Sequence, residues 1–460
     1  MNVDVAVIGA GVAGLATAYE LSRQGLSFVV LERSARRGGV ILSERIEGFT
    51  IDAGPDSLLV QKPEGIRLCE ELGLGDRLVA TLPPRVAYIQ RGGRLHPLPA
   101  ASVLGVPTQL APFARSELFS WPGKMRMAAE LFMPRRRDGS DESIGAFMTR
   151  RFGREAAAYL AEPLLAGIHA GDVDRLSLAA LFPRFVEAER THGSLIRAFR
   201  AAAAARAGGR DAESAFRSLP GGLSELVDAL VKAIGCANVR TAAAVAAVDG
   251  SGPFQVRTGG HDVTARAVVL ATPAYATASI LESRDPELSR LCAAIRYSSV
   301  ATVALAFDRG DVRHPLDGSG FVVPRSEATG ILAASWLSSK WPGRAPEGRV
   351  LLRTFMGGAR DPDVLQRDDR ALVTMSIEAL RPLLGIERMP SLARVYRWER
   401  ANAQHEVGHL DRLAAIETRL AQHPGLFVTG SGFRGVGIPD CIADARATAR
   451  AVARKLKEKS

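Results

Sequence analysis

The sequence is poor in cysteine, which limits the chemistry that it can carry. Only four of its 460 residues are cysteines, and Cys69, Cys236, Cys292 and Cys441 lie far apart. They form neither a CxxC pair nor a spacing that would ligate a metal ion. We therefore expect no metal site, and we expect the four thiols to be reduced and buried, as in a cytosolic protein.

Long apolar runs and export signals are also missing. No segment approaches the roughly 20 uninterrupted apolar residues that a membrane-spanning helix needs, so none is predicted. The amino terminus, MNVDVAVIGAG, has no basic region and no cleavage site. We therefore expect neither a signal peptide nor a transit peptide, and the predicted location is the cytoplasm.

Basic residues outnumber acidic ones, and the formal net charge is +10. A basic surface attracts nucleic acid, an anionic bilayer or an anionic substrate, although an arginine-rich composition alone gives the same charge. No nucleic-acid motif accompanies the charge, so we expect no nucleic-acid partner. The 47% of hydrophobic residues is ordinary for a folded protein, and the length predicts two or three structural units.

A nucleotide-binding βαβ unit is predicted at the amino terminus. Residues 3–8 have the pattern of a buried strand, a helix follows, and residues 28–31 form a second strand. The turn between strand and helix carries a GxGxxG motif at Gly9, Gly11 and Gly14. The first glycine permits the tight turn, the second lets the backbone approach a pyrophosphate, and the third lets the helix pack closely. Glu32, at the end of the second strand, is placed to accept hydrogen bonds from ribose hydroxyls.

The residues after Glu32 favour FAD over NAD. They add two close-approach turns and basic partners for phosphate, and they resemble the amine-oxidase branch of the flavoproteins. We expect non-covalent FAD. The predicted FAD-binding residues in this part are Gly9, Gly11, Gly14, Glu32, Arg33, Arg37, Gly38, Gly39, Gly54 and Val245.

A second glycine-rich loop lies near the carboxyl terminus, in GLFVTGSGFRGVGIPDCI. Gly430, Gly432 and Gly435 also fit GxGxxG, but too few residues follow for a second nucleotide-binding unit. We predict instead a turn that meets the flavin edge, followed by a final helix over 442–456, capped near Asp440, whose amino terminus faces the flavin. The predicted FAD-binding residues here are Gly430, Gly435, Val436, Gly437 and Ile438. No nicotinamide site is visible, so we expect oxygen or a quinone as electron acceptor.

The remaining sequence alternates between helical and strand-like segments. Residues 117–206 are rich in helix formers and predict a helical insertion. Strands are predicted by the patterns at 245–248, 254–257, 263–271, 299–307 and 320–324.

Seven segments together resemble the protoporphyrinogen oxidase family, which includes bacterial coproporphyrinogen oxidases. They are GAGVAGL, RVAYIQRGGRLHPLP, EPLLAGIHAGDVDRLSLAALFP, YSSVATVALAF, GFVVP, FMGGARDP and GSGFRGVGIPDCI. The resemblance implies an α/β fold, α+β overall, with a discontinuous Rossmann-like FAD-binding domain at 1–81, 213–290 and 413–460. It also implies a mixed-sheet substrate domain at 82–98 and 291–412, and a helical, membrane-associating region at 99–212.

The implied function is FAD-dependent oxidation of protoporphyrinogen IX to protoporphyrin IX, a six-electron reaction with oxygen as acceptor. Coproporphyrinogen III oxidation is the alternative, and an FAD-dependent amine or carotenoid oxidoreductase is a more distant one. The resemblance places substrate contacts at Arg85, Gly167, Ile168, Val322 and Phe355, with Arg85 pairing a propionate. We assign no catalytic residue, because His169, His405 and His409 are better explained as structural. An amine oxidase would need an aromatic cage, and only 6% of the residues are aromatic.

Some positions depart from the family pattern. His169 stands where the family usually has Tyr or Phe, Ser319 where many members have Phe, and Ala403 and His405 where Pro and Tyr are common. We expect these changes to alter the shape of the pocket.

A membrane contact is a further hypothesis. Apolar stretches such as LFSW and LFM, beside Arg135, Arg136 and Arg137, would suit peripheral binding to an anionic surface. Alternatively, these apolar stretches cover the substrate channel. Whether the chain forms a homodimer stays open.

Overall fold

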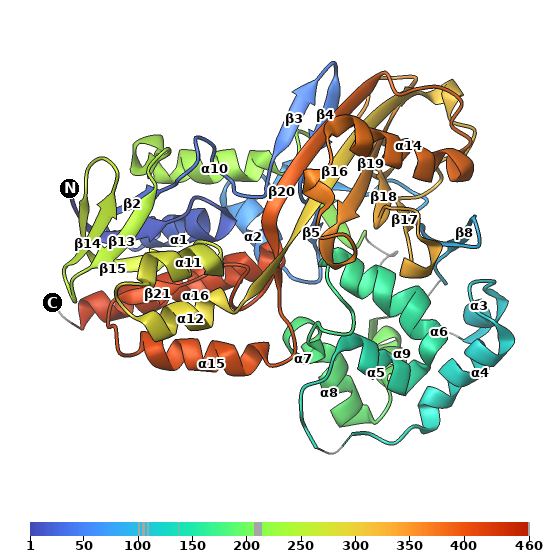
Figure 1. Ribbon diagram of the computed structural model, residues 1–460, viewed down its shortest axis with the longest axis horizontal. Helices are drawn as coiled ribbons and strands as arrows, with labels where there is room; N and C mark the ends of the chain where they lie inside the picture. Colours follow the sequence, from blue (N-terminus) through green and yellow to red (C-terminus); the bar gives the residue numbers. More distant parts are fainter. Residues whose placement is uncertain (100–101, 104–105, 108–109, 137, 207–213, 459–460) are drawn as a thin grey trace.

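The computed structural model describes residues 1–99, 102–103, 106–107, 110–136, 138–206 and 214–458. Two seven-stranded sheets lie side by side along the long axis of the molecule, and a group of helices lies beside the second sheet (Figure 1). Both chain termini belong to the part built on the first sheet. The three parts differ in layering.

The first sheet is a mostly parallel sheet with the strand order β12-β2-β1-β15-β14-β13, and β21 also pairs with β15. β1, β2, β12, β15 and β21 run parallel, whereas β13 and β14 join as an antiparallel hairpin at the edge. The strands are β1 (Asn2–Ile8), β2 (Phe28–Leu31), β12 (Val239–Arg240), β13 (Val245–Asp249), β14 (Phe254–Thr258), β15 (Val263–Leu270) and β21 (Leu426–Val428).

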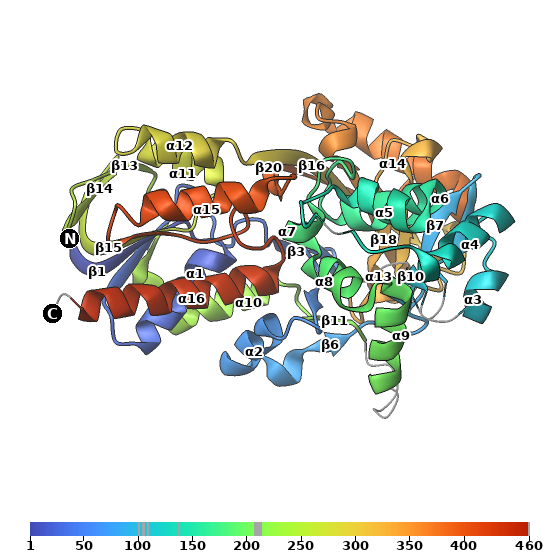
Figure 2. The same ribbon diagram turned by 90° about the horizontal axis from the view of Figure 1, so that it is seen from below.

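Helices cover both faces of this sheet (Figure 2). Val5 and Val7 of β1 point into one apolar core and Ala6 and Ile8 into the other, because alternate side chains of a strand face opposite ways. The first core is closed by α1 (Val12–Arg23), α2 (Glu64–Glu71), α10 (Ser224–Ile234) and α16 (Ile438–Lys457). The second is closed by α11 (Ala274–Leu281), α12 (Pro286–Ala293) and α15 (His409–Leu420).

The second sheet has the order β20-β16-β19-β18-β17-β7-β8. Neighbouring strands are antiparallel except β17 and β7, which are parallel. α14 (Asp369–Leu384) packs on one face, and α13 (Leu337–Lys340) connects β18 to β19. The strands are β7 (Ala87–Arg91), β8 (Arg94–Pro97), β16 (Arg296–Asp308), β17 (Gly320–Val322), β18 (Ala333–Trp336), β19 (Arg349–Gly357) and β20 (Leu392–Gln404).

Three small sheets complete the set of strands in the described residues. They contain β3 (Ser43–Ile46) with β4 (Phe49–Asp52), β11 (Phe216–Ser218) between β5 (Leu58–Leu59) and β6 (Val79–Ala80), and β9 (Ser102–Val103) with β10 (Val106–Pro107).

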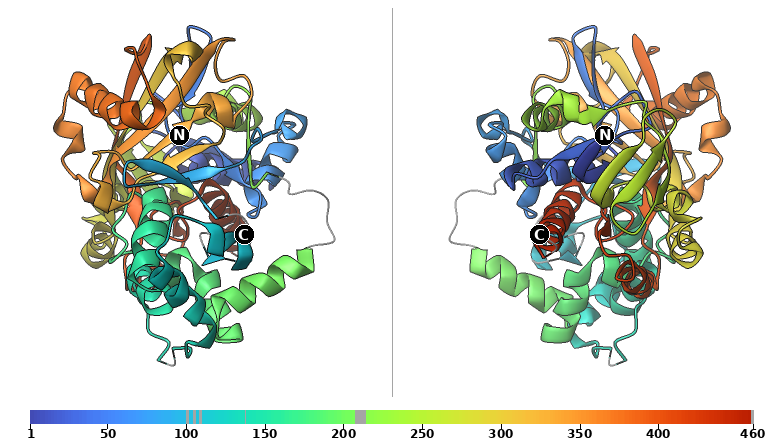
Figure 3. Two further views of the ribbon diagram at one scale, coloured as in Figure 1. Left: turned by 90° about the vertical axis from the view of Figure 1, so that its right-hand side faces the viewer. Right: turned by 90° about the vertical axis from the view of Figure 1, so that its left-hand side faces the viewer.

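The helical part lies below the second sheet in Figure 3. It contains α3 (Leu110–Arg115), α4 (Trp121–Ala128), the 3₁₀ turn η2 (Ala129–Phe132), α5 (Ile144–Phe152), α6 (Arg154–Ala156), the π-helix η3 (Ala157–Ala166), α7 (Leu178–Leu181), α8 (Pro183–His192) and α9 (Leu195–Arg206). Their apolar faces meet in one core that also receives Ile89 and Val322 from the second sheet.

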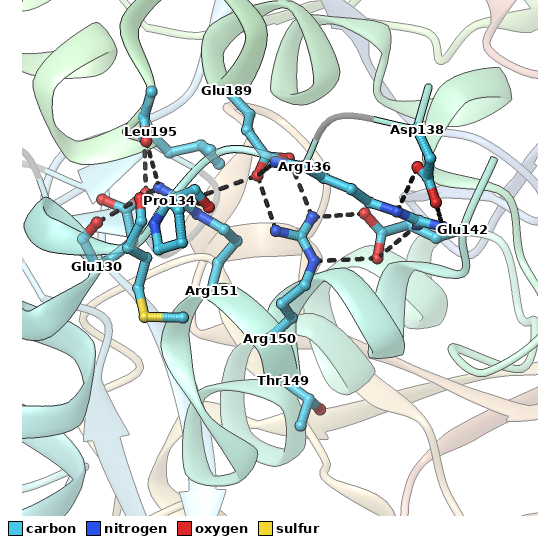
Figure 4. A network of polar contacts seen from close by, with 12 residues as sticks. Glu130, Pro134, Arg136, Asp138, Glu142, Thr149, Arg150, Arg151, Glu189 and Leu195 are labelled. Atoms are coloured by element: carbon cyan, nitrogen blue, oxygen red, sulfur yellow. Dashed lines mark hydrogen bonds and ion pairs between the residues drawn. The ribbon is translucent and has the colours of Figure 1, made fainter. Parts of the chain in front are cut away.

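A chain of ion pairs runs through these helices (Figure 4). Arg151 and Glu130 form a fully buried pair, and Glu130 also accepts the Leu195 N–H at 2.9 Å, at the amino terminus of α9. Arg150 joins Glu189 at 2.7 Å. Burying a carboxylate is costly unless it is paired and hydrogen-bonded, and here the same carboxylate fixes the start of a helix.

Most predicted elements are confirmed, with two corrections. The final helix begins at Ile438, its N-cap is Gly437, and Asp440 lies inside its first turn, so the predicted cap at Asp440 was wrong. The Cys236 thiol is exposed, whereas the other three are buried. The prediction failed there because Cys236 lies in a short turn after α10. Leu118 and Phe119 of the LFSW stretch are buried in the helical core, so most of that stretch does not face outward.

Within the described residues, we find no helix with the length and hydropathy that crossing a bilayer requires.

Candidate active site

The amino-terminal glycine loop leaves open space at one position. A Cβ on Gly14 would lie 1.9 Å from the Gly9 carbonyl oxygen, and a Cβ on Gly9 would lie 2.7 Å from that of Ala271. These two glycines are therefore needed for packing. A Cβ on Gly11 would meet no atom of the described chain within 4 Å. Gly11 is also the N-cap of α1, so its open side is suited to a pyrophosphate at the start of that helix.

The Gly38–Gly39 turn lies against this loop, as the sequence predicted for close-approach residues. The Gly38 N–H donates to the Ala10 carbonyl oxygen at 2.8 Å, and a Cβ on Gly39 would lie 3.2 Å from the Gly11 Cα. Glu32 accepts a hydrogen bond from the Ala10 N–H at 2.8 Å. The carboxylate is thus fixed beside the loop.

Other predicted FAD-binding residues lie around this loop. Val245 begins β13 two residues after Ala243, whose N–H donates to the Glu32 carbonyl oxygen at 2.8 Å. Arg33 is exposed and Arg37 half-buried. Arg36, which the sequence analysis missed, donates to the Arg37 and Ile41 carbonyl oxygens at 3.0 and 2.9 Å and so holds this turn closed.

The carboxy-terminal glycine loop meets the amino-terminal one. Gly430 has a φ of +111°, a value that L side chains avoid, and a Cβ there would lie 3.7 Å from the Ala13 Cβ. The loop continues through Gly435, Val436 and Gly437 into α16, which packs along α1. The two ends of the sequence therefore form one site at the amino termini of two helices.

Arg353 braces a third element of the site. Its guanidinium is buried, donates to the Gly54 carbonyl oxygen at 2.7 Å and lies 3.4 Å from the Asp56 carboxylate. Asp56 is also paired with Lys340 at 2.9 Å. Burial opposes the charge of Asp56, but Lys340 and Arg353 outweigh it and lower the pKa of this carboxyl. The sequence analysis predicted Gly54 but none of these charged partners.

Val322 and Phe355 lie on one face of the second sheet. Val322 pairs with Ala333 of β18, and Ala333 pairs with Phe355 of β19. Residues directly opposite one another across strands share a face. The next residue in this row is Thr302, whose hydroxyl donates to the Ala53 carbonyl oxygen at 2.8 Å. This face therefore reaches from the helical part to the Ala53–Gly54 turn.

Arg85 and Val322 line the same hollow, whose volume is about 280 Å³. Lys340 and Phe216 also line it, and Arg85 donates from Nε to the Thr81 carbonyl oxygen at 3.2 Å. The other three predicted substrate contacts do not line this hollow; they are Gly167, Ile168 and Phe355. Gly167 follows the π-helix η3 and the Ile168 side chain is 67% exposed. The structure thus brings together two of the five predicted substrate contacts in one hollow.

The three candidate histidines are poor bases in this structure. Burial lowers the pKa of His169 to about 4 and that of His405 to about 3, and it also lowers the pKa of His409. All three are therefore neutral at pH 7 and weakly basic, which agrees with assigning no catalytic acid or base among them.

Comparison with known proteins identifies the family. The model for flavin containing amine oxidoreductase matches residues 12–453. The chain belongs to this family. It is 36% identical over 455 residues to a coproporphyrinogen III oxidase of Bacillus subtilis, covering 96% of each chain. It is 28% identical over 471 residues to the chloroplastic protoporphyrinogen oxidase of Nicotiana tabacum, covering 96% of this chain and 84% of the other.

A solved structure gives the same answer. A protein of Exiguobacterium sp. 255-15, provisionally assigned as a protoporphyrinogen oxidase, superposes with a TM-score of 0.87 at 31% identity, covering 99% of each chain. Within the flavin-containing amine oxidoreductases, this chain is thus a member of the protoporphyrinogen oxidase family and an FAD-dependent oxidoreductase. The resemblance, fold class, enzyme class and FAD predicted from the sequence are confirmed.

The residues present fit FAD. The open side of Gly11 and the adjoining Gly39 turn leave room for a pyrophosphate, and Glu32 lies beside that loop. The flavin ring would then lie near Gly54 and the loop Gly430–Gly437, because both contact residues of the second sheet or next to it.

Proposed function

We propose that this enzyme oxidises coproporphyrinogen III to coproporphyrin III with molecular oxygen as acceptor, and that protoporphyrinogen IX is the second candidate substrate. The sequence alone ranked these two in the opposite order. The greater identity to the Bacillus subtilis relative, which is named for coproporphyrinogen, favours coproporphyrinogen III as the first candidate.

The cross-strand row Val322–Ala333–Phe355 is the observation that carries this proposal. It supplies an apolar surface on the side of the sheet that touches the Ala53–Gly54 turn. A porphyrinogen is a large, mainly apolar ring, and burying such a ring against apolar side chains is favourable. We infer that the ring lies between this row and the flavin.

Carboxylate arms would be held at the edge of the ring. Arg85 and Lys340 line the hollow that begins at Val322, and a guanidinium offers a bidentate fork to a carboxylate. Coproporphyrinogen has four propionates and protoporphyrinogen two, so the first offers more groups to such cations.

The catalytic contribution of the chain is chiefly positioning. Two-electron oxidation is the chemistry that bound FAD would supply, so that a six-electron oxidation would take three cycles. The apolar row would hold each ring carbon in turn and exclude water, and Arg85 would bind a propionate at the edge of the ring. We infer that non-covalent contacts alone hold the FAD, and that residues 1–81, 213–290 and 413–460 form its domain.

The substrate proposal is tested by comparing the two porphyrinogens. We expect kcat/KM for coproporphyrinogen III, followed by porphyrin fluorescence, to exceed that for protoporphyrinogen IX at least tenfold. The opposite ranking would reject coproporphyrinogen as the preferred substrate. A panel of amines, assayed for hydrogen peroxide, serves as control, and turnover of an amine with no porphyrin formation would reject the function as a whole.

We also propose a peripheral membrane contact through the tip of the helical part. The side chains of Trp121, Met125 and Phe132 on α4 and η2 are 69%, 68% and 84% exposed, and large apolar side chains gathered on one surface mark interaction sites. Lys124 lies over the Trp121 ring at 4.6 Å. The basic run offers less charge to an anionic membrane than the sequence implied, because Arg136 pairs with Asp138 at 2.7 Å. Arg137 lies outside the described residues.

Flotation with vesicles of phosphatidylglycerol and phosphatidylcholine tests this contact. We expect binding at low salt that weakens at high salt and is lost in the double variant Trp121→Ser/Phe132→Ser. Met389→Ser is the matched control, because Met389 is 66% exposed but lies outside this patch. Absence of binding by the parent enzyme at low salt would reject the contact.

A further inference from the structure

Two histidines are stacked beneath the carboxy-terminal glycine loop. The ring centroids of His405 and His409 lie 3.8 Å apart and their planes are inclined by 10°. Each side chain is 1% exposed. His405 follows β20 of the second sheet and His409 begins α15, which packs on the first sheet, so two parts of the structure each contribute one ring.

Both rings bind the backbone of the loop. His405 Nε2 lies 3.0 Å from the Ser431 carbonyl oxygen, and His409 Nε2 lies 2.8 Å from the Phe433 carbonyl oxygen. A carbonyl oxygen can only accept a hydrogen bond, so each Nε2 must carry the hydrogen. Both histidines are then neutral Nε2–H tautomers. Burial in this interface favours the neutral form, because it lowers the pKa of both rings.

These bonds fix the direction of two peptide units. In a trans peptide the carbonyl oxygen and the following N–H point to opposite sides, and the cis bonds among the described residues lie elsewhere, at Pro83–Pro84 and Gly252–Pro253. Since the Ser431 and Phe433 carbonyl groups face the histidines, the N–H groups of Gly432 and Arg434 point away from them.

We propose that His405 and His409 are positioning residues for FAD, which hold the loop Gly430–Gly437 with two carbonyl groups turned away from the flavin. If either bond is lost, a carbonyl oxygen becomes free to turn toward the flavin edge, where reduction adds negative charge. Such an oxygen would disfavour the reduced flavin by repulsion. The proposal concerns the FAD site and does not depend on which porphyrinogen is oxidised.

The link also connects the loop with the substrate side. The His405 carbonyl oxygen accepts the Ser177 N–H at 2.8 Å, in the segment that leads to α7. The neighbouring Gln404 side chain donates to the His169 carbonyl oxygen at 2.9 Å. His405 therefore contacts the loop through its ring and the helical part through its backbone. The buried polar ring at this position links these two parts.

Variants of each histidine test the proposal in the holoenzyme. His405→Leu and His409→Leu remove the donor and keep an apolar side chain of similar reach, whereas His405→Gln and His409→Gln keep an N–H donor. We expect each leucine variant to lose FAD at least tenfold more readily on dilution. We also expect its two-electron midpoint potential to become more negative by about 30 mV, which corresponds to a tenfold loss of preference for the reduced flavin. The glutamine variants should recover part of both effects.

His423→Leu is the matched control. His423 is a partly buried histidine that bonds Asp285 at 2.8 Å, away from the loop. It should change thermal stability without changing the potential. Leucine variants of His405 and His409 that lower the melting temperature but keep the parental potential would overturn the proposal, since that is the outcome for a purely structural role.

A measurement on the parent holoenzyme covers the case in which the leucine variants do not fold. With ¹⁵N-labelled histidine, we expect two ring systems with hydrogen on Nε2 and a non-protonated Nδ1 at pH 7. Detection of the Nδ1–H tautomer or of the imidazolium for these two residues would refute the hydrogen bonds on which the proposal rests.

Discussion

Arg353 donates a hydrogen bond to the carbonyl oxygen of Gly54 across 2.7 Å, although the two residues are 299 positions apart. The same guanidinium lies 4.6 Å from the centre of the Phe355 ring. One buried side chain of the second sheet therefore holds the turn assigned to the cofactor and supports the aromatic ring assigned to the substrate. The Gly54 turn and the second sheet are coupled through this contact.

Arg353→Met should destabilise the enzyme. It leaves Asp56 with one cation fewer, and removing one partner from a buried ion pair costs about 3 kcal/mol. Urea unfolding is the measurement, and Arg353→Lys should lose less because it keeps the charge. Arg296→Met on the adjoining strand β16 is the control, since the Arg296 side chain is 63% exposed and surface pairs contribute roughly 0–1 kcal/mol. Equal unfolding free energies for Arg353→Met and the parent would contradict the bracing role.

Local motifs account for what the sequence could predict. The strand, glycine turn and helix around Gly11 follow from residues adjacent in the chain, so both their structure and their cofactor could be inferred. Arg353 and Asp56 are separated by almost 300 residues, and no periodicity links them. Their pairing becomes visible only when the second sheet is placed on the Gly54 turn.

The histidine stack shows a second limit of the sequence. His405 was noted as a departure from the family pattern, but its partner is the backbone of Ser431. Every residue has a backbone carbonyl group, so the sequence does not show which of them accepts a hydrogen bond from a distant side chain. The predicted burial of Cys236 was wrong for a related reason, because its exposure depends on the path of a short turn.

Gly11→Leu should give a folded but colourless protein. A side chain at Gly11 meets open space in the described chain, so the fold should tolerate it, yet it would occupy the place of the pyrophosphate. We expect less than a tenth of the parental FAD content, measured by absorbance, with far-UV circular dichroism unchanged.

The control for this prediction is Gly14→Leu. Its Cβ would lie 1.9 Å from the Gly9 carbonyl oxygen, so this variant should fail to fold. A yellow Gly11→Leu protein with parental FAD content would show that the pyrophosphate lies elsewhere.

Stability should fall as the pH is lowered below about 6.5. Burial lowers the pKa of His405 to about 3 and also lowers that of His409, whereas an unfolded histidine titrates near 6.5. The unfolded chain therefore binds more protons in this window, and His405 removes about 1.4 kcal/mol of stability per pH unit, while His409 acts in the same direction. His169, Asp141 and Arg412 also act on this pair.

Urea unfolding between pH 6 and pH 4 measures this contribution. His405→Gln should reduce the slope of stability against pH by about 1.4 kcal/mol per unit, since one protonation site is removed. His261→Gln, at an exposed position, should leave the slope unchanged. Identical slopes for His405→Gln and the parent would mean that His405 is not held neutral in the folded state.

Arg85→Ala should weaken substrate binding without slowing the chemical step. Arg85 lines the hollow next to Val322, and a hydrogen bond to a charged group contributes about 1.5–3 kcal/mol. The corresponding loss of affinity is roughly tenfold to a hundredfold. It should appear in KM rather than kcat, because a propionate contact far from the reacting carbon changes little between the ground state and the transition state.

Arg85→Lys and Arg94→Ala make the interpretation specific. Lysine keeps the charge but not the bidentate fork, so it should recover part of the KM effect. Arg94 is an exposed arginine on the neighbouring strand β8, and its removal should leave KM at the parental value. FAD content should stay normal in all three variants, because Arg85 lies outside the glycine loops. Unchanged KM in both Arg85 variants would show that the propionates are bound elsewhere, and Lys340 would then be the next cation of the hollow to replace.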